Sequence, residues 1–322
     1  MLKKKHIRVK AGIALIIVML ILPSTHTYSQ DDFSWNDLVA WNGVTHWTNY
    51  LIVSPGYFGP NALPVPELKN GQIKKDAFFE FLGESHFSPG DKTYNLFFRY
   101  YHPFANSRIA VEFSMVPIEY YKLSSETRDK RKLRNSRPKG FAVGDLVFGT
   151  TIQLTKDKEK FPDLTLEMFC KTTSGGGLAD ARFTDHPAYY FNLNFGKDIS
   201  GLQKFDKFRW YASVGFYNWQ TNLDDYLQND APGFGIGFEI DKNNFEVHNQ
   251  ICGYYGYISF KNEAVVKVSE KSYVYKGDQP IVYRFQLLKK YQKFNIKFSY
   301  QKGLHDFAYN SVSLGFQYMP LK

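Results

Sequence analysis

One histidine motif carries the residue types that acid–base chemistry requires. His86-Phe87-Ser88 places an imidazole and a hydroxyl two positions apart, and Glu84 precedes the histidine by two. Residues two apart share one face of a strand, so His86 could activate Ser88 as a nucleophile while Glu84 orients the ring. Pro89-Gly90 follows at once, which favours a turn at Ser88. We therefore expect a polar strand end here, with a membrane-embedded lipid hydrolase as the weakest functional alternative.

The other candidate ligands are scattered. His248 lies between Glu246 and Gln250, which would supply half a metal site, but the spacing places no further ligand beside it. Gly175–Gly177 precede no expected helix, so a phosphate-binding loop is not predicted. The remaining candidates lack the spacing of a metal site: His305-Asp306, the group Asp180, Asp185 and His186, and the separated cysteines Cys170 and Cys252. No metal and no cofactor are expected.

One charge run stands out. Its seven basic residues are Arg128, Lys130, Arg131, Lys132, Arg134, Arg137 and Lys139. On an exposed loop they could contact lipopolysaccharide phosphates or anionic solutes, or could simply be solvated. Nucleic acid is not an expected partner, because removal of a leader with five basic and no acidic residues lowers the formal net charge from +9 to +4.

That leader predicts the compartment. A basic stretch from Lys3 to Lys10 is followed by an apolar run from Ile13 to Leu22 and a polar stretch that ends near Gln30. This layout is typical of a secretory signal peptide and is too short for a spanning helix. We predict a signal peptide over residues 1–30; the alternative is an uncleaved N-terminal anchor.

Beyond residue 76, apolar and polar residues alternate in short runs. In Lys293–Gln301, Phe294, Ile296, Phe298 and Tyr300 share one parity while lysine, asparagine, serine and glutamine occupy the other. Such alternation predicts strands with one apolar and one polar face. Twelve strands are predicted, at 76–87, 93–102, 107–119, 141–154, 163–172, 188–196, 207–219, 232–241, 244–258, 280–290, 293–301 and 310–319.

The connections between these strands indicate a topology. Most connections after even-numbered strands are short, whereas those after odd-numbered strands include Tyr120–Gly140, Thr173–Pro187, Gln220–Ala231 and Ser259–Gln279. Short turns at one end and long loops at the other are typical of an antiparallel transmembrane β-barrel with both termini in the periplasm. Ten or fourteen strands remain alternatives, as does a secreted β-sandwich, although the Gly-, Asn- and Ser-rich polar face favours the barrel.

The last strand completes a resemblance to a known class. Val312, Leu314, Phe316 and Tyr318 alternate with small and polar residues, as in the C-terminal strand by which barrels are recognised, although Met319–Lys322 follow. The pattern over residues 76–322 resembles the Gram-negative outer-membrane β-barrels of the small transporter-like superfamily. The stretches Gly144–Leu146 and Lys171–Gly175 are loosely similar to channels for hydrophobic compounds. The resemblance implies an outer-membrane location and contact with outer-membrane lipid and lipopolysaccharide.

The residues at the polar positions of the strands are expected to line the lumen. Their charges balance, seven acids against seven bases, which disfavours a ring of one sign and hence a selective ion pore. Twelve strands also enclose less space than an open porin. The predicted lumen residues are Glu80, Glu84, Arg99, Arg108, Glu112, Asp145, Glu167, Lys171, Arg209, Glu239, Glu246, His248, Arg284, Lys293 and Lys297.

Residues 31–75 break the alternation. Ser54–Pro66 contains four prolines, which exclude a regular helix or a central strand. Irregular backbone at membrane depth is tolerated only within protein or a water-filled cavity. We predict that this segment enters the lumen from the periplasmic side as a plug, with Tyr57, Phe58, Pro60 and Asn61 as its candidate contacts. The alternative is a periplasmic segment ordered against the rim.

These expectations combine into one functional prediction. The chain is expected to be a monomeric outer-membrane barrel that passes a small, hydrophobic solute and has no enzymatic activity. The alternative is a structural or adhesion barrel that acts through its outer loops. The sequence names no substrate.

Overall fold

The computed structural model describes residues 34–202, 204–219, 231–256 and 278–320, and the backbone of 265–268 and 271–274. The predicted signal peptide and residues 31–33 lie outside the described residues. Among those described, no helix has the length and apolar character needed to cross a membrane.

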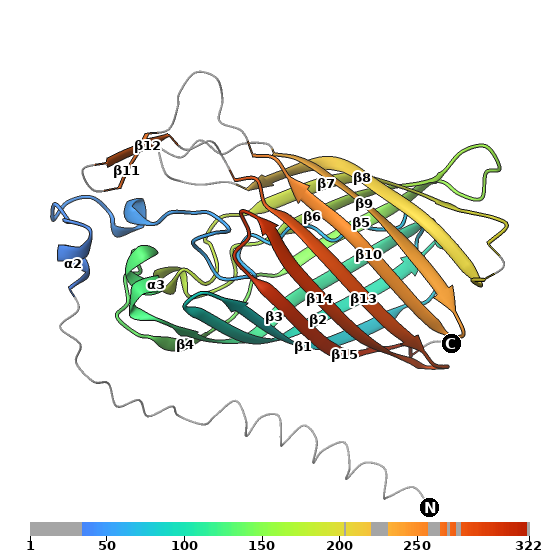
Figure 1. Cartoon of the computed structure of the whole chain (residues 1–322), viewed down its shortest axis with the longest axis horizontal. Helices are drawn as coiled ribbons and strands as arrows, with labels where there is room; N and C mark the ends of the chain where they lie inside the picture. Colours follow the sequence, from blue (N-terminus) through green and yellow to red (C-terminus); the bar gives the residue numbers. More distant parts are fainter. Residues whose placement is uncertain are drawn as a thin grey trace, which may run out of the picture. The chain divides into compact units, whose positions relative to one another are not determined.

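Twelve antiparallel strands form the wall (Figure 1). They are β1 (Phe78–Ser88), β2 (Asp91–Phe104), β3 (Ile109–Leu123), β5 (Val147–Thr155), β6 (Asp163–Lys171), β7 (Ala188–Asp198), β8 (Lys207–Trp219), β9 (Ala231–Lys242), β10 (Phe245–Tyr254), β13 (Ile281–Lys290), β14 (Phe294–His305) and β15 (Asn310–Tyr318).

Consecutive strands of the wall pair with each other, and β1 pairs with β15 from Phe79↔Tyr318 to Phe87↔Asn310. This pairing closes the sheet into a barrel without free edges, which satisfies the backbone groups that lipid cannot. The predicted fold class and the predicted count of twelve strands are therefore confirmed.

The predicted strand 141–154 is divided in two. A short strand β4 (Lys139–Ala142) pairs with the long-loop end of β3, and β5 begins only at Val147. Between them Gly144 donates its N–H to Val116 O at 2.7 Å and packs so closely that a Cβ would lie 2.8 Å from the Val116 Cβ. The chain thus leaves the β3 ladder between β4 and β5. A separate hairpin pairs β11 (Val265–Val268) with β12 (Lys271–Val274).

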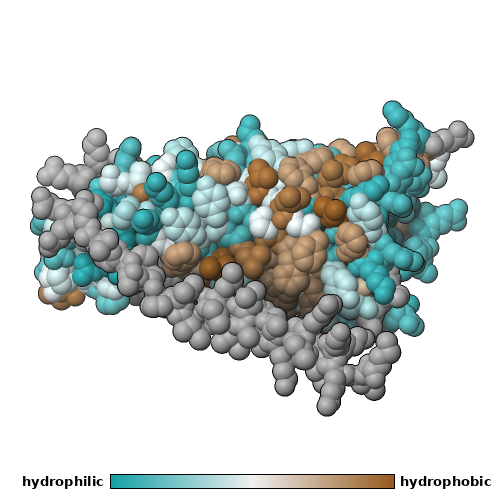
Figure 2. All heavy atoms as spheres, turned by 90° about the horizontal axis from the view of Figure 1, so that it is seen from below, coloured by the Kyte–Doolittle hydropathy of each residue, from teal (hydrophilic) through white to brown (hydrophobic). Residues whose placement is uncertain are grey.

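The outward-facing side chains of the strands form an apolar belt. Phe216, Ile236, Leu314 and Phe316 are exposed although they lie in the middle of strands. On the face shown in Figure 2, hydrophobic residues gather in a brown band between hydrophilic ends. A continuous exposed apolar surface of this kind is stable against lipid and would aggregate in water.

The two ends of the barrel differ. At the short-turn end, Asn243 and Asn244 both adopt positive φ, 51° and 63°, in the two-residue hairpin between β9 and β10. This is the backbone that a tight hairpin requires and that asparagine tolerates. At the long-loop end, the β3–β5 connection contains the helix α3 (Ser125–Lys130), whose N-terminus is capped by the Ser124 hydroxyl. The shortest connection at this end is Pro89-Gly90, as the sequence indicated.

The N-terminal segment corrects one expectation. It begins with α2 (Trp35–Leu38) and the 3-10 helix η1 (Trp47–Tyr50). Trp35 Nε1 donates to Lys132 O at 3.0 Å, which places it at the long-loop end, whereas Lys74 N donates to Tyr101 Oη near the short turns. The segment therefore enters the barrel from the long-loop end. With the short turns in the periplasm, as in bacterial outer-membrane barrels, this direction is opposite to the expected entry from the periplasmic side.

Candidate functional site: the barrel lumen

The lumen contains cavities separated by the N-terminal segment. A cavity of about 270 Å³ lies beside Pro60, Asn61 and Pro64–Glu67. A second, of about 530 Å³, lies at the short-turn end beside Asn70 and Gln72–Asp76. Between them only about 70 Å³ of space remains, lined by Glu67–Asn70. The segment thus narrows the lumen at Glu67–Asn70, inside a barrel already small in circumference.

A buried charge cluster around Arg99 holds this narrowing on the side of the 270 Å³ cavity. Arg99 Nη2 lies 3.1 Å from Glu67 Oε2 of the N-terminal segment, Nη1 lies 3.6 Å from Glu80 Oε1, and Nε lies 3.3 Å from Glu112 Oε1. Two lysines complete the cluster: Lys297 binds Glu80 and Lys69 binds Glu112, each at 3.1 Å. Three carboxylates therefore face three cations, which makes the cluster electrically neutral in this low-dielectric interior.

The long-loop end is held by a second cluster around Arg182, which is fully buried. Its Nε donates to Glu119 Oε1 at 2.7 Å, Nη1 to Asp91 Oδ2 at 2.9 Å and Nη2 to Thr93 Oγ1 at 2.7 Å. Burial alone would lower the pKa of Arg182, but Glu119 and Asp91 more than reverse this and raise the pKa above its usual value. The guanidinium therefore stays charged and ties the β6–β7 loop to the wall.

Arg131, from the β3–β5 loop, joins the same cluster. It donates to Asp91 Oδ2 at 2.7 Å and to Tyr309 Oη at 2.9 Å, and that hydroxyl also lies 3.0 Å from Phe58 O. Two long loops therefore meet on one buried carboxylate, Asp91, and the Tyr309 hydroxyl, 2.6 Å from the same carboxylate, links the N-terminal segment to them. Arg182 and Arg131, with their acceptors Asp91 and Glu119, are called the latch below.

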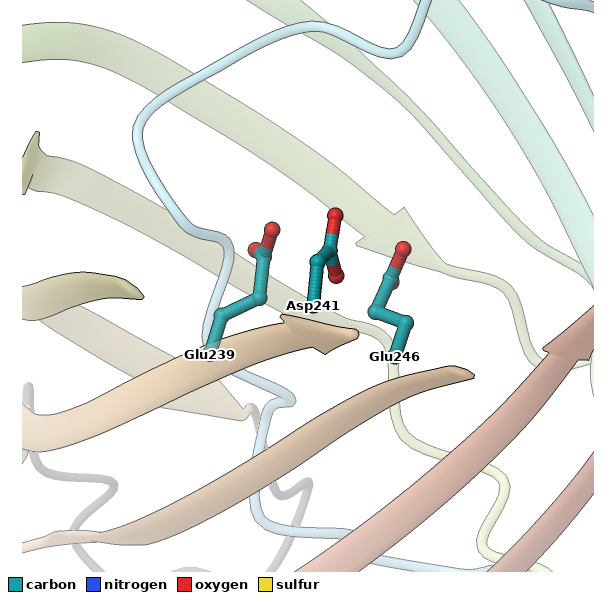
Figure 3. Close-up of side chains that lie close together, drawn as sticks. All are labelled: Glu239, Asp241 and Glu246. Carbon is teal, nitrogen blue, oxygen red and sulfur yellow. The ribbon is translucent and has the colours of Figure 1, made fainter. Parts of the chain in front are cut away.

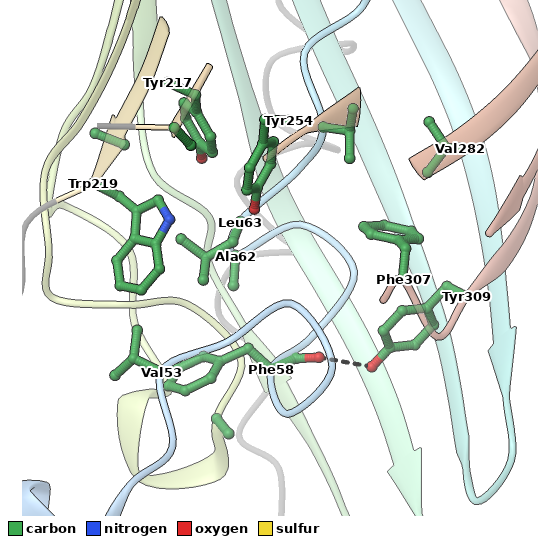
Figure 4. Close-up of a cluster of buried hydrophobic side chains, with 14 of the residues drawn as sticks. Val53, Phe58, Ala62, Leu63, Tyr217, Trp219, Tyr254, Val282, Phe307 and Tyr309 are labelled. Atoms are coloured by element: carbon green, nitrogen blue, oxygen red, sulfur yellow. Dashed lines mark hydrogen bonds between the residues drawn. The ribbon is translucent and has the colours of Figure 1, made fainter. Parts of the chain in front are cut away.

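Apolar packing covers the latch. Phe58, Ala62 and Leu63 of the N-terminal segment pack among inward side chains of several strands, including Tyr217, Trp219, Tyr254 and Val282 (Figure 4). Phe58 is completely buried. The segment is thus inserted as a core element of the barrel, with burial that stabilises it by about 1.5–3 kcal/mol per large apolar side chain.

Gly59 is positioned by close approach to the latch. A Cβ at this position would lie 2.8 Å from Arg182 Cζ, and three hydrogen bonds prevent the guanidinium from moving away. We expect Gly59→Ala to lower the free energy of unfolding by about 1–3 kcal/mol through overpacking. Gly56→Ala is the matched control, because its Cβ would meet Ser54 Oγ at an ordinary 3.8 Å. Urea titration in detergent, followed by the gel mobility of the unheated protein, measures both; equal midpoints would contradict the expectation.

At the short-turn end, Arg209 fastens the segment where it leaves the lumen. Its Nε donates to Asn70 O at 2.8 Å, and its other nitrogens bind Asp163 at 2.6 Å and Asp198 at 2.8 Å. Asn70 Nδ2 in turn donates to Glu239 Oε2 at 2.6 Å. The segment is therefore hydrogen-bonded to the wall at both ends of the lumen.

Glu239, Asp241 and Glu246 bring their carboxylates together (Figure 3), with one oxygen of each within 4.8 Å of the others. These oxygens already have cationic partners. Lys207 binds Glu239 at 2.7 Å, and Lys290 binds Asp241 at 3.1 Å and Glu246 at 2.6 Å. His248 Nε2 lies 2.6 Å from Glu246 Oε1. This ion-pair network at the short-turn rim explains why the three carboxylates lie close together.

Comparisons with known proteins agree with this architecture. No protein-family model matches the chain, and no curated protein matches its sequence. Among solved structures, the crystal structure of the COG4313 outer membrane channel from Pseudomonas putida F1 superposes with a TM-score of 0.54 at 11% identity, covering 79% of this chain and 99% of that one. The fold is that of an outer-membrane β-barrel.

Two further solved structures match less closely. The NanC porin gives a TM-score of 0.43 at 10% identity over 76% of this chain and 100% of that chain. The transport unit of the autotransporter AIDA-I from Escherichia coli gives 0.43 at 9% identity over 81% and 95%.

Most of the predicted lumen residues lie inside the outer-membrane barrel. Those on inward strand positions or lining a cavity are Glu80, Glu84, Arg99, Glu112, Asp145, Glu167, Lys171, Arg209, Glu239, Glu246, His248, Arg284 and Lys297. Arg284 donates to Pro66 O at 2.9 Å, and Lys171 binds Asp145 at 2.7 Å. Of the predicted plug residues, Pro60 and Asn61 line the 270 Å³ cavity, and Tyr57 and Phe58 pack in the apolar cluster.

Two predicted lumen residues lie elsewhere. Arg108 and Lys293 have the inward parity but are exposed in the short turns that precede β3 and β14. Each strand begins one residue later than the alternation alone would place it, so both side chains lie in the turns at the rim of the barrel. Neither is among the residues that line the described cavities.

The histidine motif is arranged differently from a hydrolase pair. His86 lies between Ser311 Oγ, 2.6 Å from Nδ1, and Asn95 Oδ1, 2.7 Å from Nε2, while Ser88 ends β1. The basic run is divided as well. Arg128 and Arg131 are buried, whereas Arg134, Arg137 and Lys139 are exposed. Two of the seven basic residues are therefore buried within the barrel, and four are exposed.

The latch is the part that sequence reasoning missed. Arg131 was counted only in the surface run, and Asp91 and Arg182 were assigned to connections. Glu119, whose parity is opposite to that of Glu112, was not among the predicted lumen residues. A β-bulge between Leu96 and Phe98 shifts the β2–β3 register there, so the inward parity changes along β3. Pro117, next to the bulge, was the one available signal.

Proposed function

We propose that this protein is an outer-membrane channel for a small, partly apolar solute, closed at rest by the N-terminal segment over residues 51–75. The observation that carries the proposal is the 270 Å³ cavity between the segment and the wall. It is slightly smaller than the usual range for small-molecule sites, about 300–1,000 Å³. A compact solute therefore fits better than an oligosaccharide or a peptide.

The lining of this cavity supports the solute class. Its lining includes the apolar side chains of Leu82, Phe97 and Phe307, and the hydrogen-bonding side chains of His86 and Ser311 lie on the same part of the wall, on the paired strands β1 and β15. The neighbouring charges are paired within the Arg99 cluster, so they form no ring of one sign. Selection by apolar contact and a few polar groups follows from this arrangement, rather than selection by charge.

The proposal includes the cellular setting. Export by the signal peptide would deliver the chain to the outer membrane of a Gram-negative bacterium, where it would act as a monomer. The exposed Arg134, Arg137 and Lys139 at the long-loop end would then lie beside lipopolysaccharide phosphates.

Single-channel conductance in a planar bilayer tests the closure. The full-length mature protein is expected to give small or intermittent current steps, and a variant lacking residues 34–70 is expected to give larger, sustained steps. A variant lacking only residues 34–50 is the matched control, since it keeps the lumen segment, and it should behave like the full protein. Heat-modifiable gel mobility shows that each barrel is folded. Equal steps in all three folded proteins would contradict closure by this segment.

A further inference from the structure

Residues 34–50 are anchored to an outer loop. Trp35 is buried, donates through Nε1 to Lys132 O, and lies under the Arg134 guanidinium with Cζ 4.6 Å from the ring centroid. Tyr50 packs edge-on against Trp35, with ring centroids 5.5 Å apart. In Figure 1, α2 accordingly lies at the end of the barrel that carries α3.

From there the chain crosses the whole lumen in one direction. Ser54 donates to Asp278 at the long-loop end, and Asn61 donates to Glu119 Oε2 at 2.9 Å. Farther along, Leu68 N donates to the Gln250 side chain at 2.9 Å in mid-strand. Gln72 then donates to Asp163 at 2.7 Å, and Lys74 N to Tyr101 Oη at 3.0 Å, beside the short turns. The segment therefore joins the two ends of the barrel and is called the thread below.

The orientation of such barrels gives the thread a direction. Bacterial outer-membrane barrels place their short turns in the periplasm and their long loops outside. We propose that residues 34–50 are displayed at the cell surface, so that the lumen segment runs from outside to inside and then continues into β1. This proposal rests on the placement of the segment alone and holds whether or not the barrel conducts.

The arrangement has a consequence for assembly. β1 closes the wall against β15, and the thread directly precedes β1 in the chain. Residues 34–50 must therefore reach the outer side before or while this seam closes. While Trp35 stays bound to the β3–β5 loop, the segment cannot leave the lumen towards the periplasm as a unit.

Cysteine labelling on intact cells tests the display. Val44, 88% exposed, is changed to cysteine in a background where Cys170 and Cys252 are serine. Ser136→Cys reports the β3–β5 loop, and Lys160→Cys reports a short turn; both positions are exposed. A membrane-impermeant maleimide is applied before and after permeabilisation of the outer membrane. Asn36→Cys, also exposed, is a second reporter should Val44→Cys fail to fold.

The expected result is equal labelling of Val44→Cys and Ser136→Cys on intact cells, with no gain on permeabilisation. Lys160→Cys should be labelled only after permeabilisation. If Ser136→Cys is labelled on intact cells while Val44→Cys and Asn36→Cys require permeabilisation, the segment does not reach the surface and the proposal is overturned. Labelling of Lys160→Cys alone on intact cells would reverse the orientation and overturn it equally.

Discussion

Replacing Arg182 with methionine is expected to lower the free energy of unfolding by about 3–5 kcal/mol, the usual loss when one partner of a buried ion pair is removed. The guanidinium is fully buried between Asp91 and Glu119, and its removal leaves Glu119 with Asn61 as its remaining described hydrogen-bond partner. The same change unfastens the β6–β7 loop from the wall. We therefore also expect more frequent current steps in a planar bilayer.

The controls separate the latch from a general loss of charge. Lys139→Met removes an exposed basic residue from the same end of the barrel and should change stability by less than about 0.5 kcal/mol. The double variant Arg182→Met/Glu119→Gln removes the stranded carboxylate and should recover part of the lost stability, because the cost lies in the unpaired charge. Urea midpoints in detergent measure all three. Equal midpoints for Arg182→Met and Lys139→Met would refute the latch.

The wall could be predicted from the sequence because membrane strands leave a local signal. Alternation of period two marks each strand, and the contrast between outward Phe316 and inward Gln317 repeats around the barrel. Closure then follows from physics, since an open edge is not tolerated in lipid. The observed strands agree with the predicted ranges to within a few residues, except where Gly144 draws the chain away from β3.

Alternation also allowed the inward charged residues to be predicted, but it did not predict which residues they pair with. Arg99 and Glu112 share an inward parity that is visible in the sequence, whereas Glu67 comes from a segment without periodicity. The partners of Arg182 are about 60 and 90 residues away in the chain, and no local pattern encodes such a pairing. The bulge at Leu96 and Phe98 added a second obstacle, because the inward parity of β3 differs between Glu112 and Glu119.

The direction of the N-terminal segment shows a different limit. Its prolines and aromatic residues indicated an irregular element that needs cover, and this agrees with the position of Phe58 inside the barrel. Composition does not say through which end a chain enters a lumen. That information lies in contacts such as Trp35 with the β3–β5 loop, which depend on the closed barrel.

Arg99 and Arg108 allow the role of a lumen arginine to be compared with that of an exposed one, because the sequence assigned both to the lumen. Arg99 contacts Glu67, Glu80 and Glu112, whereas Arg108 is exposed in a short turn. Arg99→Met leaves three carboxylates facing Lys69 and Lys297, and we expect it to lower the free energy of unfolding by about 3–5 kcal/mol. Arg108→Met should change it by less than about 0.5 kcal/mol, as exposed substitutions usually do.

The Arg99 variant should also alter the pore. Removal of one positive charge gives the narrowest part of the lumen an excess of negative charge, so the remaining current should become cation-selective. The reversal potential in a salt gradient measures this shift, and Arg108→Met should leave it unchanged. Glu67→Gln in the Arg99→Met background restores the balance of charge and should return the reversal potential towards that of the unmodified protein. A reversal potential that is the same in Arg99→Met and Arg108→Met would mean that ions bypass the Arg99 cluster, and the conducting path would then have to lie elsewhere in the barrel.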